Sequence, residues 1–194
     1  MKGALSGKKI GYAVTGSFCT HARALAAMRA LVECGCDIVP IMSENAYYTD
    51  TRFGSAEELS RKIEALTGKS IIHTVVDAEP LGPAEPLDAL VVAPCMGNTL
   101  AKAALGITDT AATMAIKAHL RSDRPLLIAL ATNDAMSQNL GNIGTMLRRR
   151  SVAFVPMRQD SPLGKPHSLV AELELIPECL ESLLLGEQKR PLFL

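Results

Sequence analysis

Short apolar segments alternate with stretches of helical periodicity along most of the chain. Six apolar runs have the length of buried strands, at about residues 9–15, 37–42, 70–75, 90–93, 126–131 and 152–155. Between them, apolar residues recur at three- and four-residue spacing and predict helices over about residues 20–34, 56–67, 99–105, 110–120, 139–149 and 175–185. This alternation predicts an α/β fold, a doubly wound three-layer sandwich whose mostly parallel sheet has about six strands.

Several element boundaries carry recognisable signals. Ser55 and Glu58 have the spacing of a capping box, and Gly68 follows that helix at the position of a left-handed cap. The connection over residues 77–86 contains three prolines, which exclude a helix and predict an ordered flap or edge loop. Residues 156–168 are expected to form a loop, and the whole chain, 1–194, to form a single domain.

The composition is that of a globular protein, with 48% hydrophobic and 21% charged residues. Twenty basic and twenty acidic residues cancel, which argues against an electrostatic binder of nucleic acids or membranes. The number of cysteines, five, is odd and shows no disulfide-like framework, so reduced thiols are expected. Cys34-Gly35-Cys36 lacks a matching second pair of cysteines, so no metal site is expected there. Because no signal-peptide pattern or apolar run of about 20 residues is present, the protein is predicted to be soluble and cytoplasmic.

In open parallel sheets, ligands bind beyond the carboxyl ends of the strands, near the point where the strand order reverses. Gly16 and Ser17 follow the first strand and predict an anion cradle at a helix start, although a simple turn and cap explains them equally well. The glycines of a dinucleotide fingerprint and a Walker-type motif are both missing from this turn. Ser43 follows the second strand, where a hydroxyl suits a monophosphate. Glu44 keeps a nicotinamide-binding alternative open, and a mere turn is the other alternative for Ser43.

The fourth apolar run gives way to a cluster of small and polar residues, namely Pro94, Cys95, Met96, Gly97, Asn98 and Thr99. Pro94 is expected to end the strand and Gly97 to allow a close approach to the backbone. The next two residues present hydrogen-bond donors at a helix N-terminus. Thr132 and Asn133 follow the fifth strand in a similar way. Helix capping explains either cluster alone, whereas the two together favour a site for a flat ring rich in hydrogen-bonding groups.

The reactive side chains are few. Cys95 lies in the candidate site, but without a visible base it is expected to serve packing or backbone placement before it serves as a nucleophile. His21 and His73 are expected to be structural, and His119 and His167 to face solvent. With three tyrosines, four phenylalanines and no tryptophan, the chain is expected to hold any bound ring mostly by backbone and aliphatic groups.

The segments "GYAVTGSFCTHA", "IVPIMSENA", "DALVVAPCMGNTLAKAALGITD" and "RPLLIALATND" together resemble the flavoprotein family that includes the cysteinyl decarboxylases and flavin prenyltransferases. The third segment is similar to the family's Pro-Ala-Thr-Ala-Asn-Thr run, with Cys95, Met96 and Gly97 in place of its middle letters. The resemblance implies a Rossmann-like fold, bound FMN, and homo-oligomers built from trimers whose interfaces complete the flavin site.

Carried over by position, the resemblance places Gly16, Ser17 and Ser43 around the FMN phosphate. It places the residues from Pro94 to Met96, together with Asn98 and Thr99, beside the flavin and substrate. Asn98 and Cys95 are the candidate catalytic residues, and the ring is also expected to lie near Thr132 and Asn133.

Four further segments, "TRFG", "AEPLGP", "TNDA" and "RQDSPLGKPHSLVAEL", are similar to a branch of the family whose members are one subunit of a two-subunit oxidoreductase. That branch implies oxidation of a dihydropyridine dicarboxylate to an aromatic pyridine, in the mother-cell cytoplasm of a spore-forming bacterium. It also implies a partner subunit that binds NADP. The candidate ligands of the substrate carboxylates are Arg52, Lys102, Arg158 and Lys165.

Two alternatives remain open at this stage. The chain could bind flavin or the dicarboxylate and support its partner without chemistry, because the sequence contains no strong acid/base pair. It could instead be a flavin-dependent decarboxylase. The catalytic histidine of the decarboxylases precedes the fourth strand closely, whereas His73 is separated from Asp88 by the proline-rich insertion, so that role is not carried over.

Overall fold

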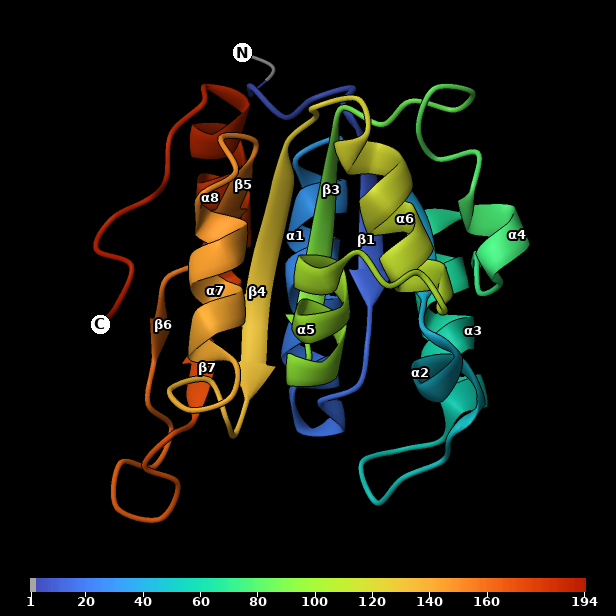
Figure 1. Cartoon of the computed structure of the whole chain (residues 1–194). Helices are drawn as coiled ribbons and strands as arrows, with labels where there is room; N and C mark the ends of the chain where they lie inside the picture. The colour runs from blue at the N-terminus through green and yellow to red at the C-terminus, as the bar shows by residue number, and fades with distance from the viewer. Residues whose placement is uncertain (1–2) are drawn as a thin grey trace.

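The computed structural model describes residues 3–194, and a seven-stranded sheet forms its centre (Figure 1). Five strands pair in parallel: β1 (Lys9–Val14), β2 (Asp37–Met42), β3 (Ala89–Cys95), β4 (Leu126–Thr132) and β5 (Val152–Phe154). The short strands β6 (Met157–Arg158) and β7 (Leu169–Ala171) pair antiparallel. The order is β2-β1-β3-β4-β7-β6, with β5 also paired to β4. The predicted doubly wound, mostly parallel sheet is confirmed.

Helices cover both faces of the sheet and divide the apolar core into two clusters. One cluster packs α1 (His21–Glu33), α3 (Ala56–Thr67) and α8 (Ile176–Leu184) against the sheet. The other packs α5 (Gly97–Leu105), α6 (Ala111–Leu120) and α7 (Leu140–Leu147) against the opposite face (Figure 1). Every residue of β3 is buried, because both faces of a central parallel strand are covered, and this explains its continuous apolar run.

The predicted helix boundaries agree with the structure to within two residues. The Ser55 hydroxyl accepts a hydrogen bond from the Glu58 N–H at 3.1 Å, and Gly68 ends α3 with φ 68°. The Thr110 and Thr113 side chains cap α6 reciprocally. Two short helices, α2 (Glu44–Tyr48) and α4 (Val75–Ala78), and two 3-10 turns, η1 (Phe18–Thr20) and η2 (Leu173–Leu175), complete the described chain.

The strand predicted over residues 70–75 is wrong. Ile72 makes a single bridge beside β2, donating to the Pro40 carbonyl at 3.0 Å and accepting from the Met42 N–H at 2.9 Å. Thr74 then starts α4, because its hydroxyl accepts a hydrogen bond from the Asp77 N–H at 3.1 Å. Helix α4 therefore includes the first two residues of the proline-rich segment 77–86, and turns follow it.

Three more predictions need correction. Pro94 does not end its strand, since β3 continues to Cys95 after a shift of register and Cys95 aligns with Leu130 of β4. The predicted loop 156–168 contains β6 and leads into β7, strands too short to produce a visible alternation. His119 is fully buried, with Nε2 2.8 Å from the Pro125 carbonyl oxygen, and this burial lowers its pKa.

Candidate functional site

The turns after four parallel strands meet at one edge of the sheet. Because β1, β2, β3 and β4 are parallel, their carboxyl ends all lie at the lower edge in Figure 1. Strands β1 and β3 are neighbours, but the chain leaves β1 for α1 on one face and β3 for α5 on the other. The site predicted from the sequence therefore falls at the topological switch point of the sheet, where α/β proteins of this kind bind ligands.

Thr15 joins the turns after β1 and β3. It is fully buried, and its hydroxyl donates to the Pro94 carbonyl at 2.8 Å and accepts from the Met96 N–H at 3.1 Å. The Thr15 N–H also bonds the Pro94 carbonyl, at 3.3 Å. These three hydrogen bonds fix the position at which the backbone leaves the sheet on either side of the switch point.

Ser17 has a backbone conformation that side chains seldom adopt, with φ 62° and ψ 49°. Its hydroxyl donates to the Ala131 carbonyl at 2.6 Å and so connects the turn after β1 to the end of β4. A left-handed residue other than glycine costs on the order of 1–2 kcal/mol, and such outliers concentrate at ligand sites. The Ser17 hydroxyl proton is used within the protein and is not available to a ligand. What this turn can offer an anion is therefore its backbone N–H groups. Gly16 is covered by Met96, whose sulfur would lie 2.6 Å from an added Cβ.

Helix α5 begins at this edge without a cap. Leu100 N–H donates to the Met96 carbonyl at 3.0 Å and closes the first turn. The preceding N–H groups, those of Gly97, Asn98 and Thr99, have no side-chain acceptor among the described residues. Unpaired N–H groups at the positive end of a helix dipole attract anions. This helix start therefore matches the sequence prediction of a donor-rich turn, and an anionic group is the ligand that it favours.

A pocket of about 270 Å³ opens in front of this helix start. Its lining includes Ser43 from the end of β2, Asn98 and Thr99 from α5, and Lys102. The Lys102 ammonium lies 2.7 Å from the Asp109 carboxylate and lowers the pKa of that carboxyl group. The structure thus brings together two turns and one of the four cations that the sequence nominated.

Glu44 also lines this pocket and has an unsatisfied oxygen. One carboxylate oxygen, Oε1, accepts a hydrogen bond from the Ala111 N–H at 3.3 Å at the start of α6. The other, Oε2, is buried and has no hydrogen-bond partner within residues 3–194. A buried acceptor without a partner is costly, so a donor from a bound molecule is expected at this position.

Gly97 allows a close approach, but the neighbour that approaches is a cluster of the protein's own side chains. An added Cβ would lie 2.5 Å from Thr132 Oγ1, 2.6 Å from Asn139 Nδ2 and 2.8 Å from Asp134 Oδ1. Asp134 accepts hydrogen bonds from Thr132 at 2.5 Å and from Asn139 at 3.0 Å. Thr132 thus braces the turn after β4 against α5, while Asn133 beside it is exposed and does not line the pocket in front of α5.

Cys95 lies in the core. Its side chain belongs to the apolar cluster beneath α5 and α6, it is only 1% exposed, and burial raises its pKa to about 12. A thiol with such a pKa is protonated at neutral pH and is a poor nucleophile. This burial favours the packing interpretation of Cys95 over a role as a nucleophile.

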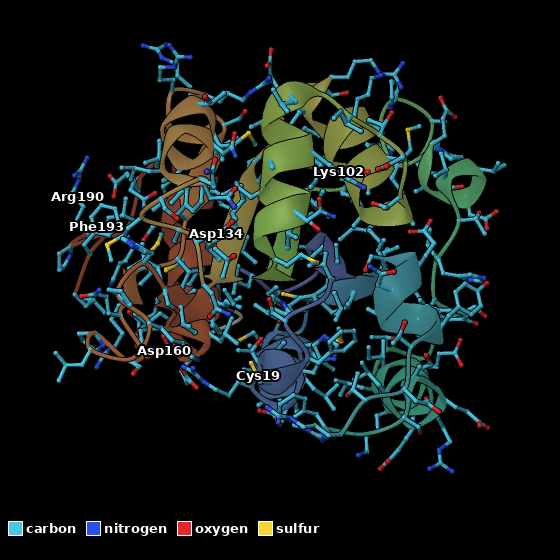
Figure 2. The ribbon with its side chains drawn as sticks, turned by 60° about the horizontal axis from the view of Figure 1, so that its bottom comes forward. Cys19, Lys102, Asp134, Asp160, Arg190 and Phe193 are labelled. Atoms are coloured by element: carbon cyan, nitrogen blue, oxygen red, sulfur yellow. The ribbon has the colours of Figure 1, made fainter. Side chains whose placement is uncertain are left out.

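The other three nominated cations lie away from this pocket. Arg52 is exposed on the loop between α2 and α3, with its guanidinium 4.9 Å from the centroid of the Phe53 ring. Arg158 pairs with Glu172 at 2.5 Å on the β6–β7 hairpin. Lys165 pairs with Asp160 at 2.8 Å and does not line the pocket. Figure 2, in which the lower edge of Figure 1 comes forward, shows Asp160 and Lys102 on different parts of the molecule.

Sequence reasoning did not identify Asn139 or Asp109 as part of this region. Both act through partners that the fold brings near, Asp134 for Asn139 and Lys102 for Asp109. The "TNDA" segment is the signal that could have indicated the first pair, because a threonine and an aspartate two residues apart commonly bond within a turn. No comparable signal marks the second pair.

The described residues contain no group of three or more His, Cys, Asp or Glu side chains arranged to hold a metal ion. Their five cysteines are free thiols. In this part of the chain, no helix has both the length and the apolar character required to cross a bilayer.

The fold and the donor-rich switch point define a class of protein. The sequence profile of the Flavoprotein family matches residues 1–172, and the chain belongs to that family. Among characterised relatives, it is 40% identical to the B subunit of dipicolinate synthase from Bacillus subtilis (strain 168) over 188 residues, 97% of this chain and 94% of the relative.

Solved structures agree with this assignment. The B subunit of dipicolinate synthase from Bacillus halodurans C superposes with a TM-score of 0.90 at 39% identity, covering 98% of this chain and 97% of that one. A dodecameric FMN-dependent UbiX-like decarboxylase from Escherichia coli O157:H7 gives a TM-score of 0.64 at 25% identity, covering 76% and 79%. The chain is therefore a member of a flavin-linked family, and it is similar to the dipicolinate synthase B subunits over nearly its whole length.

Proposed function

We propose that this protein is the FMN-binding B subunit of a dipicolinate synthase and takes part in oxidising a dihydrodipicolinate-type precursor to dipicolinic acid during sporulation. The observation that carries the proposal is that the turns after β1, β2, β3 and β4 meet at one edge of the sheet, where the turns after β2 and β3 line a donor-rich pocket. Two of the relatives named above are dipicolinate synthase B subunits, which supports this substrate.

The residues of the pocket fit the phosphate and ribityl parts of FMN. The uncapped N–H groups of α5, together with Ser43 and Lys102, provide donors for a phosphate. The unpartnered Oε2 of Glu44 is an acceptor that suits a ribityl hydroxyl, and it lies in the same pocket. In this proposal Gly16 and Ser17 add backbone donors around the phosphate, and the Met96 side chain and Asn133 border the isoalloxazine.

The chemistry that FMN supplies in such a site is acceptance of a hydride from a ring carbon. The substrate loses that hydride and one proton, and the product is an aromatic pyridine. The chain's own contribution is positional: Thr15 and Ser17 hold the turns in place, and the α5 donors fix the cofactor. Asn98, exposed in the first turn of α5 and lining the same pocket, is the polar side chain that adds to these donors.

The proposal includes partners. The A subunit of dipicolinate synthase, a nicotinamide-binding protein that uses NADP, would complete the enzyme. The FMN site would lie at an interface within a homo-oligomer built from trimers. A dodecameric assembly of the UbiX-like decarboxylase supports the oligomer by analogy. The mother-cell cytoplasm of a spore-forming bacterium is the compartment that this role requires.

A spectral titration tests the function directly. The purified protein with FMN should show an oxidised flavin spectrum that bleaches when dihydrodipicolinate is added. A bound flavin that never bleaches, with or without the NADP-dependent partner, would instead support a non-catalytic role in binding flavin or ligand. The absence of any flavin binding would contradict both forms of the proposal.

The decarboxylase alternative has less support from the structure. His73 lies beside α2, where its ring stacks on Tyr47 with centroids 3.9 Å apart and its Nδ1 lies 3.2 Å from the Ile71 carbonyl oxygen. This histidine does not line the pocket in front of α5. Release of carbon dioxide from a cysteinyl peptide by the FMN-loaded protein would nevertheless establish that activity.

A further inference from the structure

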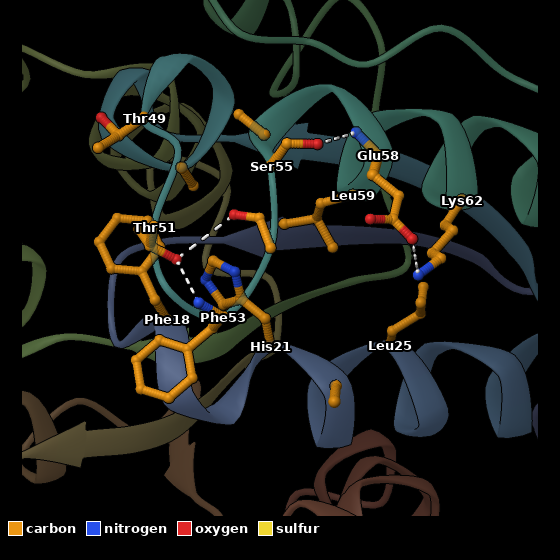
Figure 3. A pocket seen from close by; sticks show the side chains of 14 residues that line it. Phe18, His21, Leu25, Thr49, Thr51, Phe53, Ser55, Glu58, Leu59 and Lys62 are labelled. Atoms are coloured by element: carbon orange, nitrogen blue, oxygen red, sulfur yellow. Dashed lines mark hydrogen bonds and ion pairs between the residues drawn. The ribbon is translucent and has the colours of Figure 1, made fainter.

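A second pocket adjoins the proposed flavin site. The α1–α3 pocket, about 200 Å³, lies between α1, α3 and the loop that joins α2 to α3 (Figure 3). It begins at Phe18, the residue that follows Ser17 of the proposed flavin site. The volume is below the range of about 300–1,000 Å³ typical of drug-sized ligands and suits a single substituted ring.

Aromatic residues gather around this pocket although the chain has few of them. Phe18 and Phe53, two of the four phenylalanines, line it together with His21. The His21 ring lies 5.2 Å from the Phe18 ring, and its Nε2 is 2.8 Å from the Thr15 carbonyl oxygen. Since Nε2 must donate to that carbonyl, Nδ1 is left to face other groups. The pocket thus combines apolar ring faces with one polar imidazole nitrogen.

The outer wall is a rigid turn formed by residues 51–54, the "TRFG" segment. Thr51 and Gly54 exchange two backbone hydrogen bonds, at 3.0 and 3.1 Å, and the Thr51 hydroxyl accepts from the Phe53 N–H at 3.1 Å. Gly54 has φ 141°, a value that residues with side chains rarely adopt. These hydrogen bonds hold Phe53 at the pocket, although the residue is 55% exposed.

A cation stands at the α3 side of the pocket. Figure 3 shows Lys62 and Glu58 on α3 facing α1, with their charged groups 2.7 Å apart. Both side chains are about half exposed, at 54% and 47%, so this pair contributes little to stability and is easily exchanged for another partner. A carboxylate of a bound molecule can therefore replace Glu58 as the partner of Lys62. Arg52 on the turn adds a second cation near the mouth.

We propose that the α1–α3 pocket binds the ring dicarboxylate substrate, with its ring against Phe18 and Phe53 and one carboxylate on Lys62. This inference rests on the proposed function, since it supplies the substrate position that the flavin site alone does not provide. In this arrangement the Glu58 carboxylate competes with the substrate for Lys62 and weakens substrate binding. The turn of residues 51–54 sets the size of the ring that the pocket accepts.

Calorimetric titration with pyridine-2,6-dicarboxylate, the stable aromatic product, tests the inference on the full chain with and without FMN. Lys62→Met should weaken binding at least 10-fold, because it removes the cation and keeps the aliphatic stem. Glu58→Gln should strengthen binding about 3- to 10-fold, because it removes the competing carboxylate. Arg61→Met is the matched control on the same helix, and it should change nothing, since Arg61 faces another surface.

The decisive outcome is weaker dicarboxylate binding by Lys62→Met together with tighter binding by Glu58→Gln. Equal effects of Lys62→Met and Arg61→Met, or weaker binding by Glu58→Gln, would overturn the assignment, as would no binding by the unmodified protein. Each variant should bind FMN as the unmodified protein does. Failure of FMN to bind the unmodified protein would count against the proposed function, whereas normal FMN binding without dicarboxylate binding counts against this pocket alone.

Discussion

Replacing Gly97 by alanine should destabilise the protein by about 3 kcal/mol and weaken FMN binding at least 10-fold. The added methyl group would lie 2.5–2.8 Å from three hydrogen-bonded polar atoms, on Thr132, Asn139 and Asp134. Overpacking costs about 1–3 kcal/mol and a broken buried hydrogen bond about 1–3 kcal/mol more. Thermal unfolding should therefore show a Tm lower by about 6–12 °C, and a flavin titration should show the loss of affinity.

Gly141→Ala is the matched control for this variant. Gly141 lies in α7, and an added Cβ there would have no heavy atom within 4 Å. Alanine in that position should stabilise the helix by about 0.5–1 kcal/mol and leave FMN binding unchanged. A Gly97→Ala protein with unchanged Tm and FMN affinity would show that the contact between the α5 start and the β4 turn is unimportant.

Asn98→Asp should abolish most FMN binding while the fold is kept. Asn98 is exposed in the first turn of α5, where a negative charge stabilises a helix by about 0.3–1 kcal/mol. The same charge repels a phosphate dianion bound at the α5 N–H groups by roughly 3 kcal/mol, which corresponds to a loss of about 100-fold in affinity. Titration of FMN by absorbance, with Tm measured in parallel, checks both expectations.

Asn98→Ala separates the charge from the side-chain contact. It should weaken FMN binding by about 3- to 10-fold, the value of one hydrogen bond, and leave Tm nearly unchanged. If Asn98→Ala instead unfolds the protein, Asn98 is a structural cap and the site loses its main polar side chain. Equal affinity for FMN in the aspartate and alanine variants would place the phosphate elsewhere.

Most of the fold was predictable because the core is organised by simple periodicity. Strand β2 was predicted with its observed bounds, and β1 to within one residue, since both are apolar runs with clear turn signals after them. The candidate site was placed from the expected fold alone, because ligands of parallel sheets bind at the carboxyl ends of strands. The turns at Ser17, Ser43 and Asn98 were therefore identified without any knowledge of side-chain contacts.

The errors arose where a contact distant in sequence decides the structure. Residues 70–75 have an apolar strand pattern, but Thr74 caps a helix and only Ile72 bridges to β2. The direction of the Cys95 side chain depends on a register shift between β3 and β4, which no local pattern indicates. Gly97 was correctly predicted to permit a close approach, yet its neighbour is the turn after β4, and only the packed structure identifies it.

The pocket in front of α5 is expected to hold a phosphorylated flavin by its phosphate. Parallel titration of the purified protein with FMN and with riboflavin tests this most directly, because the two ligands differ only in that group. FMN should bind at least 100-fold more tightly than riboflavin, a difference of roughly 3 kcal/mol. Equal affinity for the two, or binding of neither, would contradict the account.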